Sequence, residues 1–211
     1  AVQVAQMRHK LQAAAAPLSV RVFVRDAQGD SAQVAATLAS LKALQTPGLS
    51  LQTVVLTPAP GLAEDGVEHV PMPAQAHWPT VVNRQVAAES FDWLLLLDAG
   101  ETFTAHGLWT LLLEAGDVVE CRAVYADEWV DTGNGGWGTL FRPDFNLDML
   151  LSCPQALARH WMFRRDAVLQ TGGFDLDAAD AAELDLLLRW IAADGIGGLG
   201  HVSEPLLVSS L

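Results

Sequence analysis

The pattern of apolar and polar positions predicts alternating strands and helices in the first hundred residues. Apolar runs at residues 18–24, 49–56 and 94–97 are typical of strands buried on both faces of a sheet. Residues 31–44 instead repeat their apolar side chains at helical spacing, with Ser31 as the expected cap. Two strands joined by one helix form a βαβ unit, so we expect a parallel pair with a right-handed crossover.

The rest of the chain follows a less regular pattern. The proline-rich residues 57–79 are expected to form a loop with one short strand near His69 and Val70. The glycine-rich residues 131–138 predict a hairpin loop, because they lack the helix and the Lys-Ser/Thr pair of a phosphate-binding loop. Further helices are predicted at residues 7–16, 81–89, 108–113, 146–151, 166–170 and 181–193, and strands at 117–124 and 161–163.

A carboxylate follows the third apolar run directly, at Asp98. Open α/β sheets bind their ligands outside the carboxyl ends of the strands. An ionised carboxylate is costly to strip of water and is rarely left unpaired. From these observations alone, Asp98 is either the cap of a helix from about Thr104 onward or a group that faces a cation, a metal or a polar ligand.

Composition narrows the class of protein. The 211 residues suffice for one sizeable α/β domain, and 25 acidic against 12 basic side chains argue against nucleic acid or an anionic membrane as the main partner. No apolar run approaches the ~20 residues of a transmembrane helix, and residues 1–12 lack the apolar core of a signal peptide. Cys121 and Cys153 are expected to be reduced, as in a cytosolic protein.

Three groups of segments carry a resemblance in their order and spacing. The first is residues 91–101, the second is residues 125–128 with 141–152, and the third is residues 172–175, 183–189 and 201–206. Together they resemble the family-2 glycosyltransferases with the GT-A fold, and the second group is most similar to bacterial rhamnosyltransferase-type members of O-antigen and cell-surface polysaccharide synthesis. The resemblance covers about residues 18–208.

The resemblance implies an architecture and an activity. The fold would be a mixed, mostly parallel central sheet flanked by helices. Residues 1–17 would be an N-terminal helix or flank, and residues 18–211 one domain, compatible with a longer parent protein. Within it, residues 18–101 would bind the nucleotide and residues 102–211 the acceptor. The activity would be inverting transfer of a sugar from a UDP- or dTDP-linked donor to a saccharide acceptor.

Metal assistance is part of what the resemblance implies. The departing diphosphate gains negative charge, which Mg²⁺ or Mn²⁺ offsets as a Lewis acid. The family holds this metal with an Asp-X-Asp motif whose first position corresponds to Asp98, whereas Gly100 stands at the second. Glu101 follows as a substitute ligand. His201 is a further candidate that could equally be a packing histidine.

Other site residues are assigned by their matching positions. The general base corresponds to Glu183, which could instead be a first-turn acid that favours the helix dipole. Asp185 could brace the site or pair with Arg189 four residues later. The donor-side candidates are Asp26, Asp98, Asp127 and Glu128, and the acceptor-side candidates are Gly172, Gly173, Trp161 and Asp185.

Departures from the family pattern gather at donor and metal binding. Besides Gly100, the second strand ends at Thr57, where many members carry a base-binding Asp. These departures raise an alternative function. The chain could be a degenerate, non-catalytic GT-A-like binding or scaffolding domain of a larger polysaccharide-assembly protein. A third hypothesis is a metal-independent transferase that uses Arg142 or Arg164 as its cation. The expected location is cytoplasmic, at the inner face of the membrane if a parent protein provides peripheral association.

Overall fold

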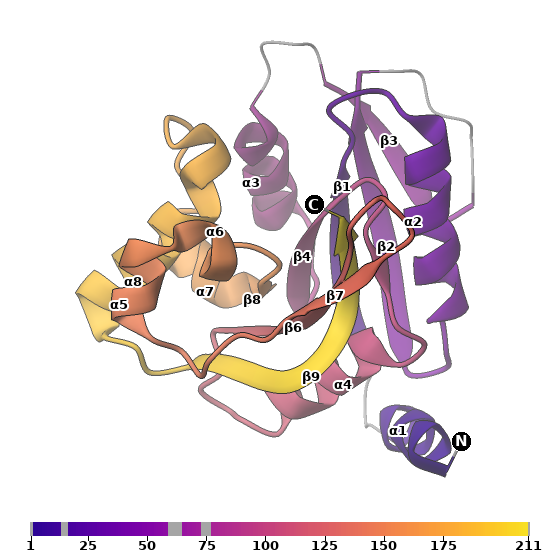
Figure 1. The fold of residues 1–211 in the computed structure, drawn as a ribbon. Coiled ribbons are helices and arrows are strands. Elements are labelled where there is room, and N and C mark those ends of the chain that lie inside the picture. Colours follow the sequence, from indigo (N-terminus) through magenta and orange to yellow (C-terminus); the bar gives the residue numbers. More distant parts are fainter. Residues whose placement is uncertain (1, 14–16, 59–64, 73–76, 211) are drawn as a thin grey trace.

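A single sheet of nine strands organises the chain, in the order β3-β2-β1-β4-β8-β6-β9-β5 with β7 paired to β6 (Figure 1). The computed structural model describes residues 2–13, 17–58, 65–72 and 77–210. The strands are β1 (Leu18–Arg25), β2 (Leu49–Thr57), β3 (Val67–Pro71), β4 (Trp93–Asp98), β5 (Thr102–Phe103), β6 (Ala123–Asp131), β7 (Trp137–Leu140), β8 (Met162–Arg164) and β9 (Leu199–Ser210).

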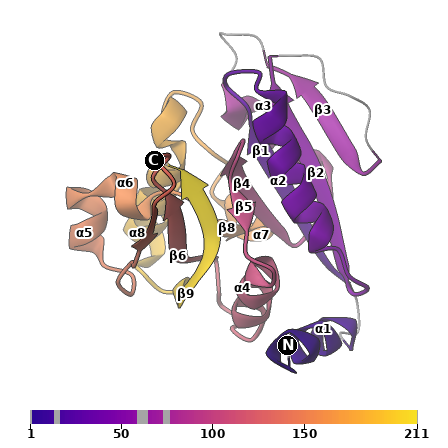
Figure 2. The same cartoon turned by 45° about the vertical axis from the view of Figure 1, so that its right-hand side comes forward.

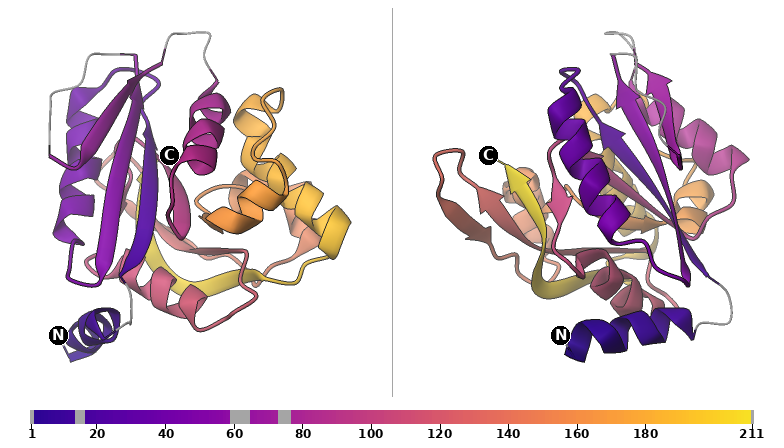
Figure 3. Two further views of the ribbon diagram at one scale, coloured as in Figure 1. Left: turned by 180° about the vertical axis from the view of Figure 1, so that it is seen from behind. Right: turned by 90° about the vertical axis from the view of Figure 1, so that its right-hand side faces the viewer.

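Helices cover both faces of this sheet (Figures 1 and 2). On one face lie α2 and α4, and α1 packs beside α4, as the views in Figure 3 show. On the other face lie α3, α5, α7 and α8. The helices are α1 (Val2–Gln12), α2 (Ser31–Ala43), α3 (Trp78–Ala88), α4 (Gly107–Gly116), α5 (Leu147–Ser152), α6 (Pro154–Leu157), α7 (Arg165–Gln170) and α8 (Ala182–Asp194), with a 3₁₀ helix η1 (Ala179–Ala181) before α8.

The sheet is parallel in its first half and mixed in its second. Strands β3, β2, β1 and β4 run parallel, so their carboxyl ends meet at one edge. Strand β8 is antiparallel to both β4 and β6, whereas β6 and β9 run parallel. This confirms the expected mixed, mostly parallel sheet flanked by helices.

The run of leucines in β4 is explained by its position in the middle of the sheet. Leu95 and Leu97 join the apolar cluster under α2 and α4, while Leu94 and Leu96 join the cluster under α3 and α8. Successive side chains of a strand point to opposite faces, so a strand covered on both faces needs apolar residues throughout. Each of the four is at most 1% exposed, which is worth about 1.5–3 kcal/mol per side chain.

The structure corrects several predicted boundaries. Helix α2 is capped by Asp30, whose carboxylate accepts from the amides of Ala32 and Gln33, so Ser31 is its first residue and not its cap. The strand predicted at residues 117–124 begins at Ala123, because residues 117–120 instead turn after α4. Helix α1 begins earlier than predicted, and the predicted residues 14–16 lie outside the described part of the chain. None of the described helices has the length and apolar character to cross a membrane.

Candidate active site

A cleft of about 510 Å³ lies at the carboxyl ends of β1, β2 and β4. This is the edge where open α/β sheets bind their ligands. Loop residues and the first turn of α8 close its other side. The polar and aromatic side chains that line it are Arg25, Asp26, Trp78, Asp98, Arg159, Asp180 and Glu183.

One arginine joins two carboxylates in this cleft. Arg25 ends β1 beside Asp98 of β4, and its Nε donates to Asp98 Oδ1 over 2.8 Å. Its Nη1 lies 3.4 Å from Oε1 of Glu183, and its guanidinium stacks 5.4 Å from the ring centre of Trp78. Burial lowers the pKa of Arg25, but the charges of Glu183 and Asp98 outweigh burial and raise it above its usual value. Asp98 therefore faces a cation and caps no helix.

Glu183 is a buried carboxylate aimed at the cleft. It lies in the first turn of α8 and is 4% exposed. Its Oε2 is buried and has no hydrogen-bond partner among the residues that the structure describes. Burial raises the pKa of Glu183, and the nearby charges of Arg25 and His160 oppose this effect without cancelling it. Such a carboxyl has an oxygen available and an increased affinity for a proton.

Asp26 fixes the floor of the cleft. Its Oδ1 accepts from the amides of Gly29 and Asp30 over 2.8 and 3.0 Å. Its Oδ2 accepts from the Thr57 hydroxyl over 2.7 Å. These bonds join the loop after β1 to the end of β2, so the carboxylate predicted on the donor side holds two strand ends together.

The Glu101 carboxylate is buried in the protein and does not line the cleft. It is 3% exposed and accepts from the Asp98 amide over 2.7 Å. Its other oxygen lies 2.7 Å from Arg159 Nη2 and 2.8 Å from His160 Nε2. Burial would raise the pKa of Glu101, but His160, the Asp98 amide and Arg159 lower it below its usual value. Glu101 is therefore fully engaged within the protein.

His160 bridges two buried glutamates. Its Nδ1 lies 2.5 Å from Glu128 Oε1, while its Nε2 faces Glu101. Burial lowers the pKa of His160, but the two carboxylates raise it to about 9. A residue other than glycine at a φ of 59° is uncommon, and His is among the types that tolerate it. We call His160, Glu101, Glu128 and Arg142 the buried bridge.

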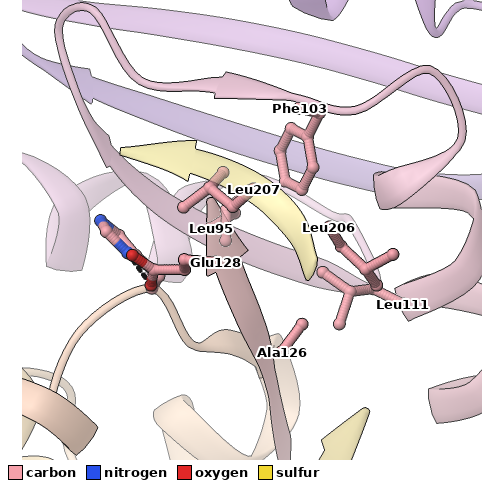
Figure 4. A pocket seen from close by; sticks show the side chains of 8 residues that line it. Leu95, Phe103, Leu111, Ala126, Glu128, Leu206 and Leu207 are labelled. Atoms are coloured by element: carbon pink, nitrogen blue, oxygen red, sulfur yellow. Dashed lines mark hydrogen bonds and ion pairs between the residues drawn. The ribbon is translucent and has the colours of Figure 1, made fainter. Parts of the chain in front are cut away.

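Glu128 belongs to the buried bridge and does not line the cleft. Arg142 Nη2 and the Ser209 hydroxyl both donate to its carboxylate. Burial would raise the pKa of Glu128, but His160 and Arg142 lower it to about 2. Figure 4 shows Glu128 at the edge of a small cavity of about 10 Å³ with apolar walls. Glu128, predicted on the donor side, is thus buried beside the cleft and is not among its lining residues.

Asp127 and His201 form a second pair away from the cleft. A β-bulge around Asp127 interrupts the pairing of β6 with β9, and bulges re-aim the neighbouring side chains. His201 Nε2 lies 3.0 Å from Asp127 Oδ1, which also accepts from the Arg142 amide. The imidazole stacks 4.7 Å from the ring of Tyr125. Neither Asp127 nor His201 lines the cleft.

Three of the acceptor-side candidates, Gly172, Gly173 and Asp185, belong to a braced turn. Gly172 and Gly173 have φ angles of 84° and 87°, which other residues rarely adopt. The expected pairing of Asp185 with Arg189 is present at 2.8 Å, and Arg189 also donates to the carbonyl of Gly173. Trp161 is 0% exposed, so its ring is covered by protein and offers no face to a sugar.

The side chains around Asp98 do not fit a divalent cation. No group of three or more His, Cys, Asp or Glu in the described ranges is arranged to hold a metal ion. Asp98 is paired with Arg25, and Glu101 is engaged in the interior. Gly100 has a φ of 97°, and a Cβ there would meet Gln33 Oε1 at 2.2 Å. An aspartate at position 100 would require an unfavourable backbone conformation and a displaced Gln33 side chain.

Sequence reasoning missed the cations of the site. It proposed Arg142 or Arg164, but the Arg142 side chain is buried against Glu128, and Arg164 donates to the Cys121 carbonyl over 2.7 Å. The cations of the cleft are Arg25 and Arg159. Arg25 carries a signal in its place at the end of β1, whereas Arg159 lies in an irregular segment with no distinguishing pattern.

A scan of protein-family models finds no match to the chain, and a search of curated proteins finds no similar sequence. Solved structures are similar in fold. S. aureus TarS 1–349 in complex with UDP matches with a TM-score of 0.65 and 10% identity over 92% of this chain and 61% of that one. TarS 1–349 in complex with UDP-GlcNAc has a TM-score of 0.65 and 11% identity, over 92% of this chain and 59% of that one.

Glucosyl-3-phosphoglycerate synthase from Mycobacterium tuberculosis, in complex with Mn²⁺, UDP and glucosyl-3-phosphoglycerate, has a TM-score of 0.60. It is 16% identical over 97% of this chain and 74% of that one. Compared with the TarS structures, the chain spans less than two thirds of their length. Identities this low show the fold, and the fold is that of GT-A glycosyltransferases.

Proposed function

We propose that the chain is a glycosyltransferase domain that moves a sugar from a nucleotide-sugar to a saccharide acceptor with inversion. The observation that carries this proposal is Glu183, a buried carboxylate with one unpartnered oxygen at the cleft. The cleft lies at the ligand-binding edge of a GT-A sheet, and the similar TarS structures were solved with UDP and UDP-GlcNAc.

Glu183 is proposed as the general base. The acceptor hydroxyl gives its proton to Glu183 as its oxygen forms a bond to the anomeric carbon of the donor. The bond from that carbon to the diphosphate breaks on the opposite face, and the electron pair leaves with the phosphate oxygen. A single displacement of this kind inverts the anomeric centre. The raised pKa of Glu183 suits the role, since a base works best when its pKa approaches the working pH.

The donor is proposed to occupy the side of the cleft formed by β1, β2 and β4. Asp98 is half exposed there, and Asp26 holds the strand ends beneath. We propose a UDP- or dTDP-linked sugar, the latter from the resemblance to rhamnosyltransferase-type members of bacterial polysaccharide synthesis. Residues 18–101 would bind the nucleotide and residues 102–211 the acceptor, with the braced turn at Gly172 and Gly173 on the acceptor side. We propose a cytoplasmic location for the domain, at the inner membrane face if a longer parent protein binds there.

A second candidate function is nucleotide binding without catalysis, inside a longer protein. The observation that favours it is the departure from the metal motif at Gly100, with Glu101 turned inward. A domain of this kind would bind a nucleoside diphosphate in the same cleft but would not use Glu183.

Calorimetry and a turnover assay together test the proposal. Titration of the protein with UDP and dTDP, each with EDTA and with Mn²⁺, is expected to show binding of at least one nucleotide. The protein is then incubated with UDP- and dTDP-linked sugars, and release of UDP or dTDP is measured. Absence of binding to either nucleotide in every condition would overturn both candidate functions. Binding with no release under any condition would favour the non-catalytic one.

A further inference from the structure

We propose that the cleft holds the diphosphate of its donor with the guanidinium groups of Arg25 and Arg159, in place of a divalent cation. The inference rests on the proposed function, because it concerns the same nucleoside diphosphate in the same cleft. It departs from the metal-assisted site that the family resemblance implies.

Arginine already occupies the position between two of the cleft carboxylates. Arg25 contacts Asp98 at 2.8 Å and Glu183 at 3.4 Å. A metal ion that used both carboxylates would have to displace this guanidinium or lie beside its positive charge, and like charges at such short range repel strongly. Arg25 is also held by its stacking on Trp78, so its position is fixed from a third side.

Glu101 is the carboxylate that could compensate for the missing second Asp, but it is held within the protein. Glu101 has hydrogen bonds or ion pairs at both oxygens, from the Asp98 amide, Arg159 and His160. If Glu101 turned toward the cleft, His160 would keep only Glu128 as its carboxylate partner. Arg159 would lose its ion pair with Glu101. Removing one partner from a buried ionic network is costly. Glu101 is therefore part of the structure that positions Arg159 and is not a free ligand.

The two guanidinium groups of the cleft each present unused donors. Arg25 and Arg159 line the same cleft, and their side chains are 20% and 36% exposed. Arg25 Nη2 and Arg159 Nη1 have no hydrogen bond to any residue of the described part of the chain. Each arginine is thus anchored on one side and has donors available on the other. Guanidinium groups match phosphate oxygens in paired hydrogen bonds, and two of them carry the charge of one divalent cation.

The test measures nucleotide affinity with and without metal. The protein is freed of metal with EDTA and titrated calorimetrically with UDP and with dTDP, and the titrations are repeated with Mn²⁺ and with Mg²⁺. For whichever nucleotide binds, the expected dissociation constants agree within about threefold across these conditions, because arginine donors need no metal. An affinity at least tenfold higher with either metal, or binding seen only with it, would overturn the inference while leaving the proposed function standing. No binding in any condition would overturn both.

Substitution of Arg159 tests whether this arginine binds the diphosphate. Arg159→Gln should weaken binding of the nucleoside diphosphate about 10- to 100-fold while changing the affinity for uridine or thymidine, which lack phosphates, less than about threefold. Arg84→Gln removes the same charge from an exposed position of α3 outside the cleft, and it should leave both affinities unchanged. Circular dichroism confirms that each variant is folded. An Arg159→Gln protein that is folded and binds the diphosphate normally would overturn the inference.

Arg25 is tested by the conservative variant Arg25→Lys. A lysine retains the charge between Asp98 and Glu183 but loses the planar fork and its stacking on Trp78. Its affinity for the nucleoside diphosphate should fall about 5- to 20-fold, whether EDTA or Mn²⁺ is present. Restoration of that affinity by Mn²⁺ alone would show that the site accepts a metal and would overturn the inference.

Discussion

Two cation bridges in this molecule use the same chemistry and differ in their surroundings. Arg25 joins Asp98 to Glu183 at the cleft, and His160 joins Glu101 to Glu128 in the interior. Both glutamates beside His160 have partners at both carboxylate oxygens, and Arg142 Nε is the atom of the buried bridge left without a partner among the described residues. The cleft bridge instead leaves Glu183 Oε2 and Arg25 Nη2 without such partners, at the surface of the cleft. Full satisfaction stabilises a buried network, and unused donors and acceptors are what a ligand can bind.

Members of the two bridges are close to one another in the sequence. Asp98 ends β4, and its amide donates to Glu101 of the other bridge. Arg159 lines the cleft and His160 lies in the interior, although they are consecutive. The buried bridge therefore fixes the positions of two cleft residues, Asp98 and Arg159, without contacting the cleft itself. A change in the buried bridge should act on stability first, and a change in the cleft bridge on chemistry.

The largest expected effect is on the rate of sugar transfer in Glu183→Gln. The amide retains the shape of the side chain but cannot take the proton of the acceptor hydroxyl, so turnover should fall about 10²–10⁴-fold. Affinity for UDP or dTDP should not fall, because Glu183 is not itself a proposed diphosphate contact and loss of its negative charge beside Arg25 leaves that guanidinium available to the phosphates. Release of nucleotide in the presence of acceptor measures the rate. Glu114→Gln, at an exposed position of α4, is the matched control. An unchanged rate in Glu183→Gln would remove it as the base.

The next largest effect is on stability, in His160→Gln. This change leaves Glu101 and Glu128 buried without their shared cation, which is expected to lower the free energy of unfolding by about 3–5 kcal/mol. Urea unfolding measures the loss. His106→Gln removes a histidine from a partly exposed pair with Glu204 and should cost no more than about 1 kcal/mol. Equal losses in the two variants would show that the buried bridge is no stronger than a surface pair.

The pH dependence of stability distinguishes the buried bridge without mutation. The pKa of His160 is raised to about 9 in the folded protein from an ordinary 6.5, so the folded state holds its proton more tightly. The stabilisation by His160 is therefore fully present below about pH 6.5 and is lost as the pH rises through about 9. Urea unfolding of the wild type at pH 6 and pH 9 should show a decrease, of up to about 3 kcal/mol.

Acid should weaken the same bridge from the other partner. The pKa of Glu128 is lowered to about 2 from an ordinary 4.5, so its stabilisation is present above about pH 4.5 and is lost as the pH falls through about 2.

The variant His160→Gln is the control for the alkaline decrease. Its free energy of unfolding should change less between pH 6 and pH 9 than that of the wild type. The same slope in both proteins would assign the effect to another group.

The parallel half of the fold was predictable from sequence because each element there has a strong local signal. The leucines of β4 must face apolar layers on both sides of the sheet. The apolar side chains of residues 31–44 lie on one face of the helix, and that face packs on the sheet. The second half depends on distant contacts. Strand β6 begins six residues later than predicted, where pairing with β8 and β9 selects its register. Apolar Val118 and Val119 resemble a strand but are exposed.

The site was predictable in its carboxylates and not in its cations. Position along the motifs was sufficient to place Asp98 and Glu183 at the cleft, where the structure brings them to one arginine. It was not sufficient for Glu128, which follows a β-bulge and turns into the interior. His160 carries no sequence signal, because its role depends on two glutamates 59 and 32 residues away. Ionic networks of this kind are formed by the tertiary structure.

The smallest expected effect concerns a third ion pair, between Asp185 and Arg189 on α8. Both side chains are about 30% exposed, and pairs of this kind at i and i+4 contribute about 0.3–0.5 kcal/mol. Asp185→Asn should therefore lower the free energy of unfolding by no more than about 1 kcal/mol, since Arg189 retains its bonds to the carbonyls of Thr171 and Gly173. Urea unfolding measures this loss beside that of His160→Gln. A loss above about 2 kcal/mol would show that the Asp185 pair contributes as much as a buried ion pair.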